Sequence, residues 1–460
     1  MPLRWLESAS RLFYGTLLRA LVPLYLLRLR GRGRAEPVYR LAFGERLGLY
    51  VDAPSAGWIW LHAVSLGETR AAEPLIAALR AALPDMRLLL THGTATGREA
   101  GVALLREGDA QVWLPLDTPG ATRRFLKHFS PRVGLLMETE VWPNLMAAAA
   151  RTGVPVLLVN ARLSDRSLRR GQRLAWLMRP AARALRGALA QTPEDARRLR
   201  EMGVARVDVM GNLKYDMRPD EARMDLGRRW RAASPRPIVM AASTREGEEQ
   251  GLLDTWREAL AAFEPDDPAR PRLLLVPRHP QRFDAVAQMI GAAGLSLSRR
   301  STWTAGSDSH GEPNEHNAAE EPNATEEHNA ADEPDAAACA ADVWLGDSLG
   351  EMAAYYAAAA LALLGGSFAP LGGQNLIEAA ACGCPVIMGP HTFNFAQAAH
   401  RAEQAGAALR VDDIDAGVKA AVRLIGDAPA LSAMSRQALE VAGRDRGAAQ
   451  RALRAILGVM

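Results

Sequence analysis

A glutamate directly after a short apolar segment occupies a position where it could do acid–base chemistry. Glu68 ends the sequence Ser65-Leu-Gly-Glu, which follows the apolar run at 58–63. There a carboxylate can project from a strand-to-helix turn, gain a raised pKa from partial burial, and act as a general base worth about 10² to 10⁴ in rate. A capping interaction at the start of the next helix explains the same spacing equally well. The sequence leaves both roles open.

A glycine-rich loop near the C-terminus has the composition of an anion site. Residues 365–373 read GGSFAPLGG and lead from an apolar run into a helix expected from 374 or 375. Glycines let the backbone approach closely, and the N–H groups and positive end of a helix suit a phosphate. Glu378 follows one turn later and begins the pattern E-x4-G-x-P. It could accept hydrogen bonds from ribose hydroxyls, or form a surface salt bridge.

Two further charged clusters follow apolar runs. Arg278 and His279 stand between two prolines and form a stiff cationic corner suited to a phosphate or carboxylate, although a structural salt bridge is an equal alternative. Glu138 and Glu140 form a carboxylate pair. They could bind acceptor hydroxyls or amines, or hold the region of Arg162.

Other nucleotide and metal signatures are missing from the sequence. The G-x-G at 31–33 lacks a third glycine and no G-x4-G-K-[ST] occurs, which disfavours a nicotinamide or ATP enzyme. The D-x-D at 413–415 lies late among other acids, so no metal site is expected there. The cysteines at 339, 382 and 384 include no C-x-x-C pair, which excludes a zinc ribbon or a disulfide framework and indicates a reducing cytoplasm.

The elements that position these residues follow an α/β pattern. Short apolar runs alternate with longer segments of helical period, which predicts βα units and parallel sheets. The candidate residues follow such runs, at the strand ends where open α/β sheets bind ligands. A polar stretch between two groups of runs predicts an interdomain linker, and hence two α/β domains in tandem. The expected strands are 58–63, 87–90, 133–137, 155–159, 238–241, 272–276, 362–364 and 385–388, and the polar stretch is 216–237.

Composition supports two or three domain-sized cores. The chain has 460 residues, 48% of them hydrophobic and 23% charged, which excludes collagen and disorder throughout. The net charge of +3 is uneven, because residues 1–40 hold eight arginines against two glutamates. This end of the chain is suited to membrane headgroups, nucleic acid or a phosphorylated substrate. The acidic segment 305–340 contains almost nothing apolar beyond alanine, which predicts a disordered loop.

The N-terminus also carries an apolar run. Residues 12–27 are broken only by Arg19 and are followed by four arginines. As a helix this run spans roughly 24 Å, short of the ~30 Å hydrocarbon core, which favours an interfacial or partly inserted anchor over a full span. The arginines fit the positive-inside pattern and place the rest of the chain in the cytoplasm. An ordinary buried helix with a basic tail is the alternative.

Eight segments occur in order between about residue 38 and about residue 425. They are HAVSLGE (62–68), ETEVWPN (138–144), NARLSDRS (160–167), GNLKYD (211–216), ASTREGEE (242–249), VPRHPQRF (276–283), LGDSLGEMAAYY (345–356) and GGSFAPLGGQNLIEAAACGCPVIMGPHTFNF (365–395). Together they resemble the 3-deoxy-D-manno-octulosonic acid (Kdo) transferases of Gram-negative bacteria. Arg245 stands where many members are expected to carry His, Gln374 where some do, and the acidic insert is not part of the pattern.

The resemblance implies a GT-B fold, with two Rossmann-like domains facing across a cleft. The expected parts are a membrane-associated anchor helix at 1–34, an acceptor-binding domain at 35–215, a linker at 216–236, a nucleotide-sugar-binding domain at 237–430 that contains the insert 305–340, and helices at 431–460 that pack back towards the N-terminal domain.

The resemblance also implies an activity. The protein would be an inverting, metal-independent transferase without a cofactor, moving Kdo from CMP-Kdo to the 6'-hydroxyl of a tetraacylated lipid A precursor. It would work on the cytoplasmic face of the inner membrane, with membrane lipids and no nucleic acid as partners. Glu68 would be the base. The implied donor-binding residues are Arg278, His279, Gly366, Ser367, Asn375 and Glu378, and those that order the cleft or bind the acceptor are Ser65, Glu138, Arg162 and Lys214.

Two other functions remain open from the sequence. The pattern E-x4-G-x-P occurs across the GT-B fold, so a transferase or 2-epimerase acting on a UDP-sugar is an alternative. A catalytically silent, membrane-bound scaffold that kept the fold is another.

Overall fold

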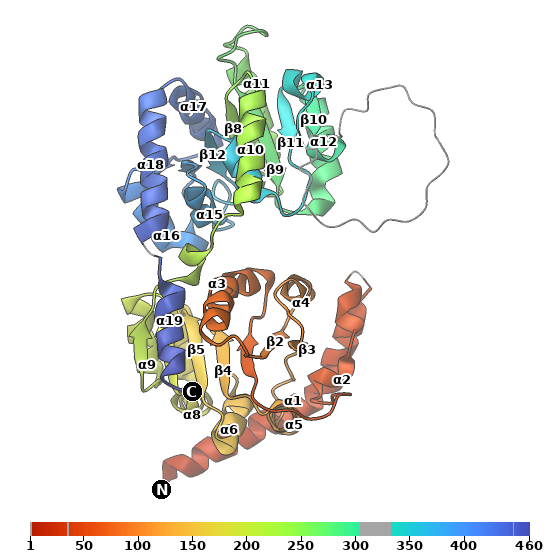
Figure 1. Cartoon of the computed structure of the whole chain (residues 1–460), viewed down its shortest axis with the longest axis vertical. Helices are drawn as coiled ribbons and strands as arrows, with labels where there is room; N and C mark the ends of the chain where they lie inside the picture. Colours follow the sequence, from red (N-terminus) through yellow and green to blue (C-terminus); the bar gives the residue numbers. More distant parts are fainter. Residues whose placement is uncertain (1, 35, 304–332, 445) are drawn as a thin grey trace, which may run out of the picture. The chain divides into compact units, whose positions relative to one another are not determined.

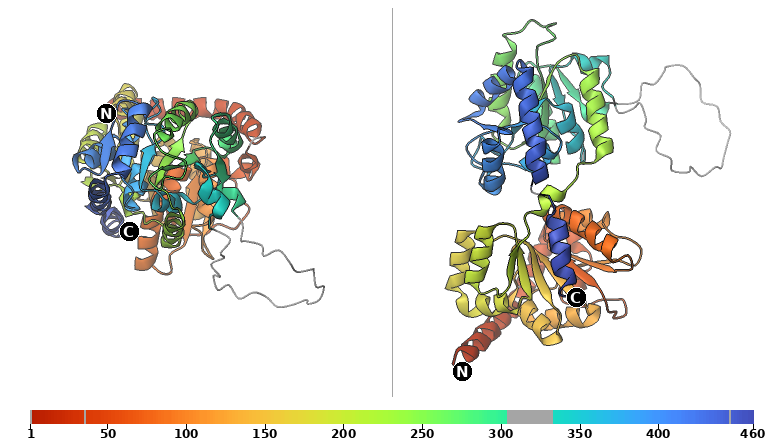
Figure 2. Two further views of the ribbon diagram at one scale, coloured as in Figure 1. Left: turned by 90° about the horizontal axis from the view of Figure 1, so that it is seen from above. Right: turned by 60° about the vertical axis from the view of Figure 1, so that its left-hand side comes forward.

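The computed structural model describes residues 2–34, 36–303, 333–444 and 446–460, and the chain divides into two units. Unit 1 comprises Met1–Met217 and Asp445–Met460, and unit 2 comprises Arg218–Arg444. Each unit is built on a parallel seven-stranded sheet with helices on both faces (Figures 1 and 2).

In unit 1 the sheet is buried on both sides. Ile59 and Leu61 belong to one apolar cluster and Trp60 to the other, as expected for a parallel strand covered by helices on each face. The strand order is β3 (Ala110–Trp113), β2 (Leu88–His92), β1 (Ile59–His62), β4 (Val133–Met137), β5 (Val156–Ala161), β6 (Gly187–Ala190) and β7 (Val207–Val209). The helices are α1 (Pro2–Arg32), η1 (Pro37–Arg40), α2 (Phe43–Arg46), α3 (Leu66–Ala82), α4 (Ala95–Val102), α5 (Pro119–Phe129), α6 (Pro143–Thr152), α7 (Asp165–Arg173), α8 (Ala175–Ala184), α9 (Pro193–Met202), η2 (Leu213–Asp216) and α19 (Ala448–Leu457).

Unit 2 repeats this plan. Its strand order is β10 (Leu297–Arg299), β11 (Val343–Leu345), β9 (Arg272–Pro277), β8 (Ile238–Thr244), β12 (Leu361–Leu364), β13 (Val386–Met388) and β14 (Ala408–Arg410). The α-helices are α10 (Glu221–Ala233), α11 (Glu249–Leu260), α12 (Phe283–Ala292), α13 (Ala336–Ala340), α14 (Met352–Ala358), α15 (Leu376–Ala381), α16 (Ala396–Gln404), α17 (Ile414–Ile425) and α18 (Ala428–Arg444).

Each strand predicted from the sequence is present; β4 has the expected ends, and the ends of the others are shifted by at most three residues. The strands that were not predicted, β3, β6, β7, β10, β11 and β14, are only three or four residues long. Such short runs carry too little periodicity to be distinguished from loops.

The expected linker at 216–236 is a helix over most of its length, so that prediction is wrong for α10. The Asp220 carboxylate accepts the N–H groups of Ala222 and Arg223 and starts the helix. Trp230 is fully buried, and Gly227 allows close contact with Ala354 of α14, where a Cβ would collide with the backbone. The polar residues that suggested a linker form the outer face of this helix.

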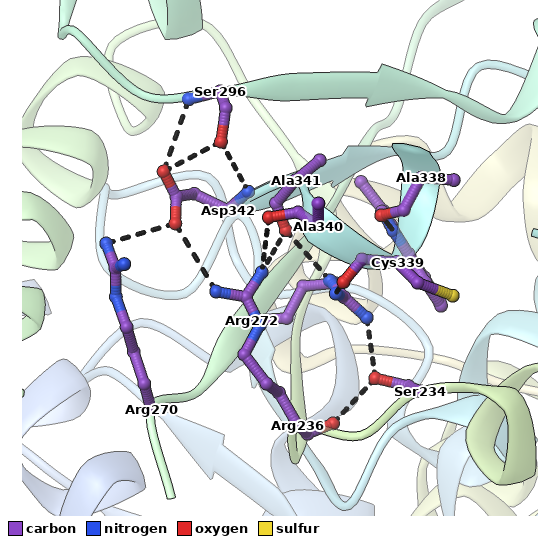
Figure 3. A network of polar contacts seen from close by, with 11 residues as sticks. Ser234, Arg236, Arg270, Arg272, Ser296, Ala338, Cys339, Ala340, Ala341 and Asp342 are labelled. Atoms are coloured by element: carbon purple, nitrogen blue, oxygen red, sulfur yellow. Dashed lines mark hydrogen bonds and ion pairs between the residues drawn. The ribbon is translucent and has the colours of Figure 1, made fainter. Parts of the chain in front are cut away.

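The end of the acidic insert is also ordered. Residues 304–332 lie outside the described residues, but α13 forms a short helix within the segment expected to be a loop, which makes that prediction wrong for 336–340. The buried Arg272 holds its end (Figure 3): the guanidinium donates to the Ala341 carbonyl at 3.0 Å and to Ser234 Oγ at 2.5 Å, and lies 4.4 Å from the Trp344 ring.

Both flanks of the undescribed segment are held by α10. The Trp303 ring lies 5.3 Å from that of Trp230, edge to face, and Glu333 pairs with Arg229 at 3.0 Å. Arg229 and Trp230 are neighbours in the sequence. One turn of α10 therefore fixes the chain on either side of 304–332.

The expected anchor contains one long helix. α1 has 31 residues, or roughly 46 Å, and residues 5–32 are long and apolar enough to cross a membrane. The length argument against a full span is therefore wrong. Only 11% of its apolar window is buried, which also argues against an ordinary buried helix. The helix packs on α6 and α8 with one stripe, and its large exposed apolar side chains are Trp5, Leu6, Leu12, Phe13, Leu17, Leu21, Leu24, Tyr25 and Leu27.

The C-terminal helices belong to different units. α18 packs on α15 and α17 within unit 2, whereas α19 packs on α3 and η2 within unit 1. The Asp216 carboxylate accepts the N–H groups of Gly447 and Ala449 and so caps α19. The prediction that helices in 431–460 pack on the N-terminal domain is therefore wrong for α18, which packs within unit 2.

Candidate active site

In unit 1 the candidate residues gather at the carboxyl edge of the sheet. Because β1, β4 and β5 are neighbours, the turns after them lie side by side. The Glu138 N–H donates to the Val159 carbonyl at 2.9 Å, and the Arg162 N–H donates to the Glu138 carbonyl at 3.3 Å. Glu138 has a φ of 57°, a left-handed conformation that is uncommon for a residue other than glycine and often marks functional sites. The structure therefore brings Glu68, Glu138 and Arg162 to one edge.

Glu68 lies in the first turn of α3 and is half-buried. One carboxylate oxygen accepts the Val64 N–H at 2.8 Å, and the other accepts the Ser65 hydroxyl at 3.1 Å. The Ser65 Oγ accepts the Glu68 N–H in return. The capping interaction that the sequence offered as an alternative is thus present.

The electrostatic environment of Glu68 nevertheless favours proton transfer. Its pKa is raised to about 7, chiefly by burial; the negative charges of Glu138 and Glu140 also raise it, whereas the hydrogen bonds from the Val64 N–H and Ser65 lower it. A carboxyl group that titrates near neutral pH can accept a proton from a hydroxyl and release it again. The cap therefore orients a carboxylate whose pKa is raised mainly by burial.

Lys214 lies further along the same edge, in η2 after β7. Its N–H donates to Asn212 Oδ1 at 3.0 Å, and the Leu213 N–H donates to the Oδ1 of the buried Asn160 at 3.1 Å. Asn160 is the last but one residue of β5, so the segment that carries Lys214 is tied to the strand next to β4.

In unit 2 cationic side chains gather at the corresponding edge. Arg278 follows β9 and its N–H donates to the Thr244 carbonyl of β8 at 2.9 Å. Partial burial lowers the pKa of His279, and so do the positive charges of Arg245, Arg278 and Arg282. These three arginines therefore lie around the histidine. Arg282 pairs with Glu249 at 3.2 Å. Arg245 and Arg278 form no ion pair with any residue in the described part of the chain, so they are suited to an anionic ligand.

A buried glutamate that the sequence analysis missed holds the glycine loop. Glu248 is 7% exposed, and one of its carboxylate oxygens accepts the N–H groups of Gly366 at 2.7 Å and Arg245 at 2.9 Å. Its other oxygen accepts the Ala369 N–H at 3.4 Å. The Gly366 N–H, expected to face a phosphate, therefore faces Glu248. The signal available in the sequence was the segment ASTREGEE, which contains Glu248.

Ser367 is also engaged inside the loop. It is fully buried, its hydroxyl donates to the Leu364 carbonyl, and its Oγ accepts the Gly389 N–H at 2.9 Å. A Cβ on Gly365 would collide with the Ser243 carbonyl, so only glycine permits this approach of β12 to β8. In this geometry Gly366 and Ser367 shape the loop.

Asn375 and Glu378 stand at the start of α15. Asn375 Oδ1 is buried and has no hydrogen-bond partner among the described residues, which leaves an acceptor at the start of the helix. Glu378 is half-buried. Burial raises the pKa of Tyr356 well above its usual value, and the charges of Glu378 and Arg278 both act on this tyrosine. Glu378 and Arg278, two candidate donor-binding residues, therefore both lie near the buried Tyr356.

The described residues contain no group of three His, Cys, Asp or Glu side chains arranged to hold a metal ion. In the D-x-D pattern, the Asp413 carboxylate accepts the Ala416 N–H at 2.8 Å and starts α17, and Asp415 pairs with Lys419. These contacts are those of a helix N-terminus.

The two parallel α/β units define the fold class as GT-B, which comprises glycosyltransferases and nucleotide-sugar epimerases. A glycosyltransferase structure from Rickettsia africae matches with a TM-score of 0.55 at 10% identity, covering 88% of this chain and 98% of that one. A UDP-GlcNAc 2-epimerase from Neisseria meningitidis matches with a TM-score of 0.52 at 14% identity, covering 88% and 99%. At this identity the likeness concerns the fold alone.

Sequence comparison identifies the family. The family model described as 3-deoxy-D-manno-octulosonic-acid transferase (kdotransferase) matches residues 42–217. The 3-deoxy-D-manno-octulosonic acid transferase of Bordetella pertussis is 46% identical over 455 residues, covering 96% of this chain and 98% of the relative. That of Haemophilus influenzae is 32% identical, covering 96% and 97%. This chain belongs to the Kdo transferase family, and the resemblance inferred from the eight segments is confirmed.

Proposed function

We propose that this protein is an inverting, metal-independent glycosyltransferase that moves Kdo from CMP-Kdo to the 6'-hydroxyl of a tetraacylated lipid A precursor. The observation that carries the proposal beyond family membership is the half-buried Glu68, whose pKa of about 7 suits a general base at neutral pH. The family relationship over nearly the whole chain supports the choice of donor.

In the proposed reaction Glu68 takes the proton from the acceptor hydroxyl, and the oxygen of that hydroxyl attacks the anomeric carbon of Kdo. A carbon–oxygen bond forms there, and the bond from the same carbon to the CMP phosphate breaks on the opposite side. Ser65 and the Val64 N–H orient the carboxylate. Glu138, Arg162 and Lys214 order the acceptor or the loops around it.

The leaving CMP gains negative charge, which the cationic groups of unit 2 would stabilise. Arg278 and His279, together with Arg245, are the groups proposed to bind the phosphate. Asn375 and Glu378 are proposed to bind the ribose. Gly366 and Ser367 contribute by shaping the loop, with Glu248 fixing it to the start of α11.

We also propose that α1 attaches the protein to the cytoplasmic face of the inner membrane. Its outer face carries large exposed apolar side chains, and arginines follow its apolar run. Changing Leu12, Phe13 and Leu24 to Gln should move the full-length protein from the membrane fraction to the soluble fraction. Retention of this variant on membranes would contradict the assignment.

The activity is tested with purified protein, CMP-Kdo and the tetraacylated precursor, in the presence and absence of EDTA, with the product followed by mass spectrometry. A mass increase of one or more Kdo units that is insensitive to EDTA is expected, with Glu68→Ala inactive but still binding CMP. Release of UDP from UDP-sugars, without reaction of CMP-Kdo, would favour the UDP-sugar alternative. A folded protein with no activity on either donor would indicate a silent scaffold.

A further inference from the structure

An apolar pocket lies in unit 1 and is lined in part by Thr139, Val141 and Arg162, which follow β4 and β5. It has a volume of about 290 Å³ and is enclosed by α7, α8, α9 and the ends of β4 and β5. Its apolar walls include Leu158, Leu174, Met178, Met202 and Val204. The size is close to the lower limit of small-molecule sites, so the pocket suits a single hydrocarbon chain and not a whole lipid.

The charged groups that line this pocket are two arginines. Arg162 and Arg170 line it with exposed side chains, and neither forms a hydrogen bond or ion pair through its side chain with any other described residue. The one acidic residue of α7, Asp165, lies near Arg197 and Arg198 of α9. An apolar interior with unpaired guanidinium groups at its edge matches an amphiphile that carries a phosphate.

The pocket begins next to the carboxylates of the candidate site. Thr139 and Val141 both line it, and they alternate in the sequence with Glu138 and Glu140. The charges of these two glutamates act on Glu68. A molecule with a chain in the pocket would thus have its head group near the base within the same unit.

We infer that this pocket receives one acyl chain of the phosphorylated lipid acceptor, and that Arg162 and Arg170 bind a phosphate of the same molecule. The inference rests on the proposed function for the identity of the lipid. It assigns the acyl chain a direct part in acceptor recognition, separate from the attachment of α1 to the membrane.

A pocket-filling variant tests this assignment. Gly171 lines the pocket on α7, and a Cβ there would meet only the flexible end of the Met202 side chain. Gly171→Leu therefore fills part of the space while improving the helix propensity of α7. Gln172→Leu is the matched control, because Gln172 is exposed on the same helix and does not line the pocket.

Acceptors that differ only in acylation give the first measurement. Gly171→Leu should raise KM for the tetraacylated acceptor about tenfold, with KM for CMP-Kdo unchanged. With an acceptor stripped of its acyl chains, the variant, the control and the parent should give the same KM. An unchanged KM for the tetraacylated acceptor, or an equal rise with both acceptors, would overturn the inference.

Photo-crosslinking tests the pocket without turnover. A tetraacylated precursor with a diazirine in one acyl chain should label peptides from α7 to α9 in the parent protein and not in Gly171→Leu. If this labelling occurs but no Kdo is transferred, the proposed function fails and the lipid pocket stands. Labelling confined to α1, or equal labelling of α7 to α9 by a diazirine-bearing phosphatidylglycerol, would show that the pocket is not an acceptor site.

Discussion

The carboxylates at the carboxyl edges of the two sheets have opposite surroundings. In unit 1, burial raises the pKa of Glu68 to about 7, and the like charges of Glu138 and Glu140 contribute to the rise. In unit 2, Glu248 accepts three backbone N–H groups, and Glu351 pairs with Arg300 at 2.9 Å. The same architecture thus places a carboxylate near other acids in one unit and among N–H donors or an arginine in the other.

The comparison shows that burial alone does not give a carboxylate a chemical role. N–H donors and arginine partners favour the charged form of a buried acid, and the same contacts stabilise the loops that supply them. Burial and nearby acids favour the neutral form and so raise the pKa. Substitutions in unit 1 should therefore affect the chemistry, and those in unit 2 should affect loop position or stability.

The largest effect is expected at Glu68. Glu68→Gln keeps an acceptor oxygen for the Val64 N–H but cannot take a proton, so kcat should fall about 10³-fold. CMP affinity, measured by calorimetry, should not change. Ser65→Ala is the comparison for the capping role: it should cost about 1 kcal/mol of stability and, because Ser65 helps to orient the carboxylate, lower kcat far less than Glu68→Gln does. Equal losses of kcat in the two variants would mean that Glu68 acts through the cap.

Loss of the Glu248 carboxylate should have the next largest effect. In Glu248→Ala, the N–H groups of Gly366 and Arg245 lose their acceptor, which should lower the free energy of unfolding by about 3 kcal/mol. CMP affinity should fall about tenfold, because the glycine loop loses its position. Calorimetry and denaturant unfolding measure both effects. Glu246→Ala, in the exposed part of the same loop, is the control; a stable Glu248→Ala protein with normal CMP affinity would contradict the role of Glu248.

A smaller effect, on stability alone, is expected at the other end of the unit 2 sheet. Asp342 accepts the Ser296 hydroxyl at 2.8 Å and pairs with Arg270 at 3.0 Å (Figure 3). Asp342→Ala should lower the free energy of unfolding by about 1 kcal/mol and leave kcat unchanged. Urea unfolding and the transfer assay measure the two quantities. Reduced kcat in a folded variant would mean that carboxylates in this unit do more than support the fold.

The smallest effect concerns pH. In the proposed mechanism the carboxylate form of Glu68 is the base, so kcat/KM should fall as the pH drops below about 7, the pKa of Glu68. Glu138→Gln removes one like charge and so lowers the pKa of Glu68. The fall of kcat/KM on the acidic side of the pH profile should therefore move about half a unit to lower pH. Glu73→Gln, on the exposed side of α3, is the control and should leave the acidic side of the pH profile unchanged. A shift to higher pH in Glu138→Gln would reverse the sign of the proposed interaction.

The sequence could predict features that depend on neighbouring residues. The run Val-Gly-Leu-Leu-Met gave β4 with its observed ends, and the spacing of Ser65 and Glu68 gave both the cap and a candidate base. It could not predict contacts between distant segments. Glu248 lies 118 residues before Gly366, and nothing in the local sequence of either residue indicates that the two are hydrogen-bonded. The polar outer face of α10 suggested a linker. The helix could not be recognised from the sequence, because the contacts that bury Trp230 come from residues far along the chain.

The fixed flanks of the segment 304–332 have a practical consequence. Arg229 and Trp230, adjacent on α10, contact Glu333 and Trp303, so the two described ends of the chain lie against the same turn of this helix. The entropy of closing a flexible connection grows only slowly with its length, and a doubling costs about 0.6 kcal/mol. This position is therefore a natural graft point, where a fluorescent reporter or an affinity tag could replace the native segment while both sheets keep their fold.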